Sequence, residues 1–148
     1  MPPHFQISLP FGDFVLLDRT DTFEGRAIIH HVLRRKSAFI RKAAGTGNAE
    51  QVVASNIDTI FICMSLNSDF NLRRLERYLA IAWSSGALPV VTLTKADLCD
   101  DVAAKTAEAE SVAIGAEILV TSSLADAGHE QILPYLKFGS TAAFIGSS

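Results

Sequence analysis

The chain has 148 residues, of which 49% are hydrophobic and 20% charged, and its formal net charge is −3. This composition is typical of a globular protein with one modest domain or slightly more, and the chain as a whole carries no polycationic nucleic-acid signal. No apolar run approaches the ~18–20 residues of a membrane span, so we expect no membrane partner. The two cysteines form neither a disulfide framework nor a zinc site, which favours a reducing, cytoplasmic compartment.

Short β-like segments make up residues 1–47. Residues 14–17 and 26–33 are rich in strand-forming side chains and are bounded by turn residues. Two or three strands bury too little surface to be stable alone, so they should pack on the rest of the chain or belong to a larger barrel. Residues 43–48 are typical of a flexible joint, which divides the chain into predicted units 1–47 and 48–148.

A basic segment lies in this N-terminal part. No acidic residue occurs between Glu24 and Glu50. Such a segment indicates either a surface for a polyanion such as RNA or a solvated loop and strand edge. The candidate RNA-binding residues are Arg34, Arg35, Lys36, Arg41 and Lys42.

From about residue 52 strands and helices alternate. Near-continuous apolar runs predict buried strands, and apolar residues at helical spacing predict the helices between them. A parallel sheet with right-handed crossovers follows from this order. The predicted strands are 57–66, 88–94, 117–121 and 141–145. The predicted helices are 72–85, 102–114 and 131–137. Gly86 should end the first helix, and Asp100 or Asp101 should cap the second.

Thr94-Lys95-Ala96-Asp97 follows the second of these strands, where a guanine-reading loop of the form (Asn/Thr)-Lys-x-Asp is expected. The Asp97 carboxylate can accept hydrogen bonds from N1–H and the 2-amino group of guanine, a donor pair that adenine lacks. The Lys95 stem can lie along the base, and the Thr94 hydroxyl can join a neighbouring loop. Alternatively, Thr94 simply ends a strand and Asp97 caps the next helix.

Two further polar loops follow strands and should share one edge of the sheet with Thr94. Ser122 and Ser123 could present a main-chain N–H to the guanine carbonyl, or form a plain polar turn. Residues Gly146, Ser147 and Ser148 have the form of the opening of a phosphate-binding loop, G-x-x-x-x-G-K-[ST]. We therefore count Thr94, Lys95, Asp97, Ser122, Ser123, Gly146, Ser147 and Ser148 as candidate nucleotide-binding residues.

Four segments together resemble the RsgA (YjeQ) family of circularly permuted, ribosome-associated GTPases. They are residues 41–45, 51–61, 67–79 and 89–98, and the run DFNLRRLERYL within the third is long and specific. The resemblance extends over roughly residues 11–148. It implies an α/β fold: a Rossmann-like, parallel-sheet half of a permuted P-loop GTPase domain, preceded by a partial OB-fold.

The resemblance also implies a function. Family members hydrolyse GTP in late maturation of the small (30S) ribosomal subunit and contact 16S rRNA. They bind GTP or GDP together with Mg²⁺, and their C-terminal domain holds a zinc ion. By motif match, the residues that read the base are Thr94, Lys95 and Asp97, and those that open the phosphate loop are Gly146 and Ser148. The match of Ser122 and Ser123 to the Ser-Ala-Lys loop of the family is loose, because Leu124 stands where that loop often has lysine.

Several family features are missing from the sequence. The phosphate-loop lysine, the switch regions and a zinc cluster do not occur in these 148 residues, and Gly12-Asp13-Phe14-Val15 matches a mid-barrel element of the OB-fold. We therefore expect a fragment that is itself catalytically incomplete. Two alternatives remain open: a non-catalytic RNA- or ribosome-binding module on the same scaffold, and an unrelated domain that prefers adenine nucleotides.

Overall fold

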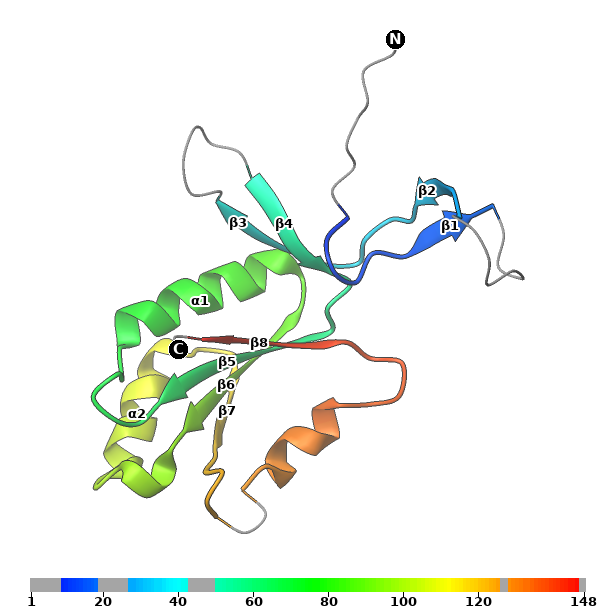
Figure 1. Ribbon diagram of the computed structural model, residues 1–148. Coiled ribbons are helices and arrows are strands. Elements are labelled where there is room, and N and C mark those ends of the chain that lie inside the picture. The colour runs from blue at the N-terminus through cyan, green and yellow to red at the C-terminus, as the bar shows by residue number, and fades with distance from the viewer. Residues whose placement is uncertain (1–8, 19–26, 43–49, 126–127, 147–148) are drawn as a thin grey trace.

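The structure, a computed structural model, describes residues 9–18, 27–42, 50–125 and 128–146. Two antiparallel hairpins lead into a four-stranded parallel sheet with helices (Figure 1). The predicted joint at 43–48 lies outside the described residues. The elements are β1 (Val15–Leu17), β2 (Ile29–Val32), β3 (Ala38–Lys42), β4 (Glu50–Ser55), β5 (Thr59–Ser65), α1 (Leu72–Ser85), β6 (Leu88–Thr94), η1 (Ala96–Leu98), α2 (Val102–Val112), β7 (Glu117–Val120), η2 (Glu130–Tyr135) and β8 (Ala142–Gly146).

The parallel sheet has the strand order β7-β6-β5-β8, which confirms the predicted α/β fold class. Successive side chains of a strand face opposite sides of the sheet. Ile60 and Ile62 pack with Leu75 and Leu79 of α1 on one side, and Phe61 packs on the other. All five of these side chains are buried, which explains why β5 reads as an unbroken apolar run.

Local signals explain the ends of the two long helices. The Asn71 side chain accepts a hydrogen bond from the Arg74 N–H at 3.0 Å and begins α1, and Gly86, with φ 84°, ends it. Asp101 caps α2 by accepting from the Ala104 N–H at 2.9 Å. Both predicted helices are confirmed, and of the two proposed caps for α2 Asp101 is the one used. No helix among the described residues is both long and apolar enough to span a membrane.

The third predicted helix differs from expectation, because η2 is a 3₁₀ helix that contains Pro134 and ends at Tyr135. A proline inside a helix lacks an N–H and favours a short, tight turn. The centres of the Tyr135 and Phe61 rings lie 5.6 Å apart in an edge-to-face arrangement, and this contact fastens η2 to the sheet. Burial, together with a hydrogen bond involving Glu117, raises the pKa of Tyr135 to about 12.

Strands β3 and β4, which the sequence analysis did not predict, pair antiparallel from Ala38 opposite Ser55 to Lys42 opposite Glu50. This hairpin crosses the predicted boundary between residues 47 and 48. It lies next to α1, with Phe39 packed against the main core cluster. A division of the chain at that point would therefore separate two paired strands.

A polar junction joins the β1–β2 hairpin to the rest of the molecule. Arg35 donates two hydrogen bonds to Asp13, at 2.7 and 2.9 Å, and the Ser55 hydroxyl donates a third at 2.6 Å. The Asn56 amide donates to the Gly12 carbonyl oxygen at 2.8 Å. A Cβ on Gly12, whose φ is 89°, would lie 2.1 Å from the Ser55 carbonyl oxygen, so only glycine fits there.

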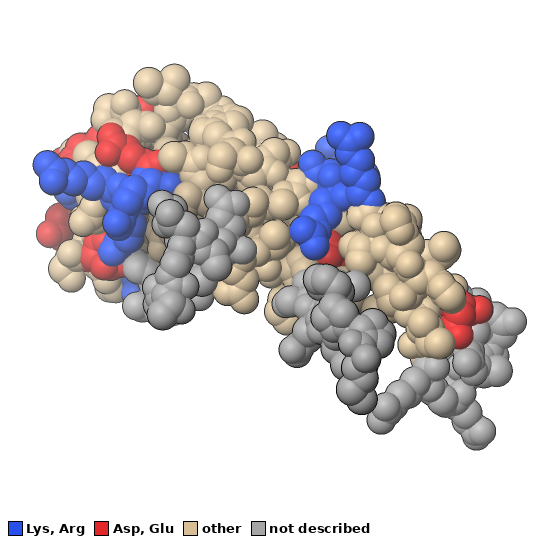
Figure 2. All heavy atoms as spheres, turned by 90° about the horizontal axis from the view of Figure 1, so that it is seen from above, with Lys and Arg blue, Asp and Glu red and all other residues tan. Residues whose placement is uncertain are grey.

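Arg35 thus has a role in the fold that differs from its predicted contact with RNA. Its guanidinium is bound to a carboxylate whose side chain is only 2% exposed. The hydrogen bonds from Arg35 lower the pKa of Asp13 from its ordinary value, although burial acts in the opposite direction. By contrast, Arg34 and Lys36 are exposed, and Figure 2 shows basic side chains gathered where the β1–β2 hairpin joins the larger part.

Candidate functional site

The candidate site lies at the edge of the sheet where the parallel strands end. Register pairs Ser65 with Thr94, Leu93 with Val120, and Cys63 with Gly146, so the strands end at nearly the same level. The loops after β6 and β7 are neighbours, whereas β5 separates them from the end of β8. Gly146 ends β8 at this edge, and Ser147 and Ser148 lie outside the described residues.

The loop after β6 turns sharply at Lys95, which adopts the left-handed conformation with φ 58° and ψ 41°. Asp97 follows inside the short helix η1, and both side chains are exposed. Because Asp101 caps α2, the alternative in which Asp97 caps that helix is wrong. Thr94 also differs from expectation: its carbonyl oxygen, not its hydroxyl, joins the neighbouring loop by accepting from the Leu66 N–H at 2.9 Å.

A direct contact joins the loops after β6 and β7. The Ser122 hydroxyl donates a short hydrogen bond to Asp97 Oδ1. Main-chain bonds brace the same loops, from the Thr121 N–H to the Leu93 carbonyl at 2.7 Å and from the Ala96 N–H to the Thr121 carbonyl at 3.2 Å. The second oxygen of Asp97 makes no hydrogen bond with any described residue. The carboxylate is therefore fixed in direction, with Oδ2 and the second lone pair of Oδ1 left for a ligand.

A pocket of about 340 Å³ opens beside these two loops. One wall comes from the end of β6, another from the loop after β7, and a third from the segment that begins η2. The first two walls contain residues predicted from the sequence, and the third does not. The lining residues are Thr94, Lys95, Thr121, Ser122, Ser123, Gly128, His129 and Ile132.

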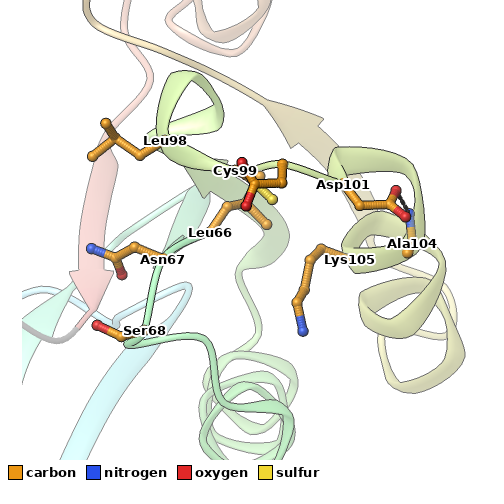
Figure 3. Close-up of a pocket in the computed structure, with 9 residues that line it drawn as sticks. Leu66, Asn67, Ser68, Leu98, Cys99, Asp101, Ala104 and Lys105 are labelled. Atoms are coloured by element: carbon orange, nitrogen blue, oxygen red, sulfur yellow. Dashed lines mark hydrogen bonds between the residues drawn. The ribbon is translucent and has the colours of Figure 1, made fainter.

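Another pocket, of about 420 Å³, lies between the loop after β5 and the start of α2 (Figure 3). Lys105 extends from α2 into this space. Its ammonium already pairs with Glu108 at 3.2 Å and lies 4.6 Å from the centre of the Phe70 ring. Asp101 is engaged in capping α2. None of the candidate nucleotide-binding residues lines this second pocket, so the candidate site is the first one.

A parallel sheet with helices, polar loops at its carboxyl edge and a fixed carboxylate beside a pocket defines an α/β domain with a ligand site at the place where parallel sheets bind ligands. Comparison with known proteins makes the assignment specific. The family model of the RsgA GTPase matches residues 32–148, and the chain belongs to this family. The resemblance drawn from the sequence is thereby confirmed.

Several curated relatives are similar over most of this chain. It is 48% identical over 137 residues to the small ribosomal subunit biogenesis GTPase RsgA 2 of Lactiplantibacillus plantarum, covering 93% of this chain and 38% of that protein. It is 46% identical over 138 residues to the RsgA protein of Methanosarcina acetivorans, covering 93% of this chain and 37% of the relative. The chain thus spans less than two fifths of the length of these relatives.

Two solved structures share the fold. The crystal structure of YloQ, described as a circularly permuted GTPase, superposes with a TM-score of 0.69 at 22% identity, covering 98% of this chain and 48% of that one. YjeQ from Thermotoga maritima gives a TM-score of 0.72 at 23% identity, with coverages of 96% and 48%. The agreement supports the fold alone at this level of identity.

Proposed function

We propose that this chain provides the guanine-reading part of a GTP-binding and GTP-hydrolysing factor in small ribosomal subunit biogenesis. Its family membership and the names of its relatives support this assignment. The observation that carries the proposal is the hydrogen bond from Ser122 to Asp97, which joins the loops after β6 and β7 around one carboxylate.

The chemistry of guanine explains why such a carboxylate is useful. Asp97 accepts hydrogen bonds from N1–H and the 2-amino group, while Ser122 prevents the carboxylate from turning away. Lys95 covers the base with its aliphatic stem, and a main-chain N–H of the Ser122–Ser123 loop binds the guanine carbonyl. Adenine would leave Asp97 without donors, and where the bound base excludes water from such a carboxylate the wrong ligand is rejected by as much as ~10⁴-fold.

The phosphates belong at the end of β8 in this proposal. A Cβ on Gly146 would lie 2.6 Å from the Cys63 carbonyl oxygen, so the main chain there runs close to β5 without a side chain between them. Gly146, Ser147 and Ser148 open the loop that holds the phosphates through main-chain N–H groups. When bound, Mg²⁺ neutralises charge on the phosphates during phosphoryl transfer.

The same proposal places 16S rRNA against the N-terminal part. Arg34 and Lys36 are exposed beside the junction, and Arg41 and Lys42 end β3. We propose that the predicted units, a partial OB-fold in residues 1–47 and the permuted GTPase domain in 48–148, belong to a cytoplasmic protein. Because β3 and β4 pair across residues 47 and 48, the two units share this hairpin in our proposal. No group of three or more His, Cys, Asp or Glu residues that could hold a metal ion occurs among the described residues.

Nucleotide titration tests the guanine assignment. The protein expressed from its complete reading frame should bind GDP and not ADP in isothermal titration calorimetry, and Asp97→Ala should weaken GDP binding at least about 100-fold, because two hydrogen bonds to a charged group are lost. Asp100→Ala is the matched control, since Asp100 is also exposed but lines the other pocket. Equal affinity for ADP and GDP, or an Asp97→Ala protein with unchanged affinity, would contradict the assignment.

A further inference from the structure

We propose that His129 forms the third wall of the nucleotide pocket and packs its ring against the nucleoside part of the bound guanine nucleotide. This inference rests on the proposed function, since it takes the pocket beside Asp97 as the place of the base. His129 lines that pocket together with Thr94, Lys95 and Ser122. It stands outside the base-reading motif, seven residues beyond Ser122 in the chain.

The fold holds His129 firmly beside the two base-reading loops. A Cβ on the preceding Gly128 would lie 1.9 Å from the Ser122 carbonyl oxygen, so the main chain before His129 is pressed against the loop after β7. The Gln131 side chain donates to the Val120 carbonyl at 3.3 Å, and Ile132 packs on the buried cluster around Phe61. These contacts fix the segment on both sides of His129.

The imidazole of His129 is not used by the fold. The residue precedes η2 and its side chain makes no capping hydrogen bond. Its main-chain carbonyl accepts from the Ile132 N–H at 3.0 Å, whereas its ring has no hydrogen bond or ion pair with any described residue. The ring is exposed and borders the pocket. An aromatic ring in this position is free to contact a ligand.

Pocket size and chemistry indicate what the ring meets. About 340 Å³ is enough for a purine together with part of its sugar, and Lys95 is among the residues that line the pocket. Aromatic side chains stack on nucleobases without regard to base identity, and loss of such a contact typically weakens binding fivefold or more. His129 should therefore raise affinity for the nucleotide, while Asp97 and Ser122 determine its identity.

Substitution of His129 tests the inference on protein from the complete reading frame. His129→Ala should weaken GDP and GTP binding by the same factor, about five- to fiftyfold, with the preference over ADP retained. His129→Phe, which keeps a ring, should bind within twofold of the wild type. His30→Ala is the matched control, because His30 is also exposed, lies on β2 and does not line the pocket.

The outcomes separate this inference from the proposed function. If His129→Ala binds GDP as the wild type does while Asp97→Ala does not, the His129 contact is refuted and the guanine assignment stands. A His129→Phe protein as weak as His129→Ala would also refute ring packing. If the wild-type protein binds no guanine nucleotide, the proposed function itself fails. As a readout independent of mutation, the imidazole NMR signals of His129 should shift on addition of GDP, and those of His30 should not.

Discussion

The two parts of the molecule differ in how they are held together. In the parallel sheet Ile60, Phe61 and Ile62 are fully buried, at 0% exposure. In the β1–β2 hairpin Leu16 is 58% exposed and Ile28 59% exposed. The sheet is stabilised by its own apolar core, whereas this hairpin is fastened by the hydrogen-bonded junction around Asp13.

This difference has a consequence for function. A sheet with its own core can hold the base-reading loops after β6 and β7 in a fixed geometry, as a binding site requires. A hairpin fastened at one polar junction depends on that junction for its orientation, and its exposed apolar residues leave surface for other contacts. The two proposed roles, guanine binding and RNA binding, accordingly fall in the two differently built parts.

The largest effect should come from the core of the sheet. Leu75→Ala removes a fully buried side chain between α1 and β5, and the resulting cavity should lower the free energy of unfolding by about 2–5 kcal/mol. Leu16→Ala, at an exposed position of β1, should change it by less than about 0.5 kcal/mol. Urea unfolding of the 148-residue chain measures both. Equal losses for the two variants would contradict the comparison between core and hairpin.

A smaller effect should come from the junction. Arg35→Ala leaves the buried Asp13 carboxylate with the Ser55 hydroxyl and without its cation, which should cost about 1–3 kcal/mol. Because the folded-state pKa of Asp13 is lowered, its contribution is fully present above the unfolded pKa and is lost as the pH falls below that value toward the folded pKa.

Unfolding measured between pH 6 and pH 2 tests this linkage. The wild-type protein should lose more stability over that range than Asp13→Asn, in which the titrating group is absent. Hydrogen exchange should locate the damage of Arg35→Ala in β1 and β2, with protection of β5 and β6 retained. Exchange that increases equally in β5 would show that the junction supports the whole molecule and not the hairpin alone.

Much of the parallel sheet was predictable from sequence because its signals are local. The apolar run over 88–94 coincides with β6, and Gly86 ends α1 as expected. Strands β3 and β4 were missed because their short, basic and polar segments, AFIRK and EQVVAS, lack a clear alternation. The helix η2 contains Pro134, whose missing N–H disfavours a regular α-helix, whereas the pattern of apolar residues alone indicated an ordinary helix.

The candidate site was predictable only where residues are close in sequence. Asp97 stands in a recognisable motif, but its bond to Ser122 joins residues 25 positions apart and requires the β6–β7 pairing. The Asp13–Arg35 pair spans 22 positions, so charge patterning alone counted Arg35 among RNA-binding residues. A single histidine in a loop carries no signal of its own, and only the pocket indicates a role for His129.

The smallest effect concerns the exposed charges beside the junction and tests whether the two parts have separate functions. Replacing Arg34 and Lys36 with glutamine should weaken binding of a 16S rRNA fragment by about tenfold at 0.1 M salt and flatten the salt dependence, because fewer counterions are released. GDP binding should not change, since neither residue lines the pocket beside Asp97. A loss of GDP affinity in the Arg34 and Lys36 variant would show that the hairpin and the sheet do not act as separate parts.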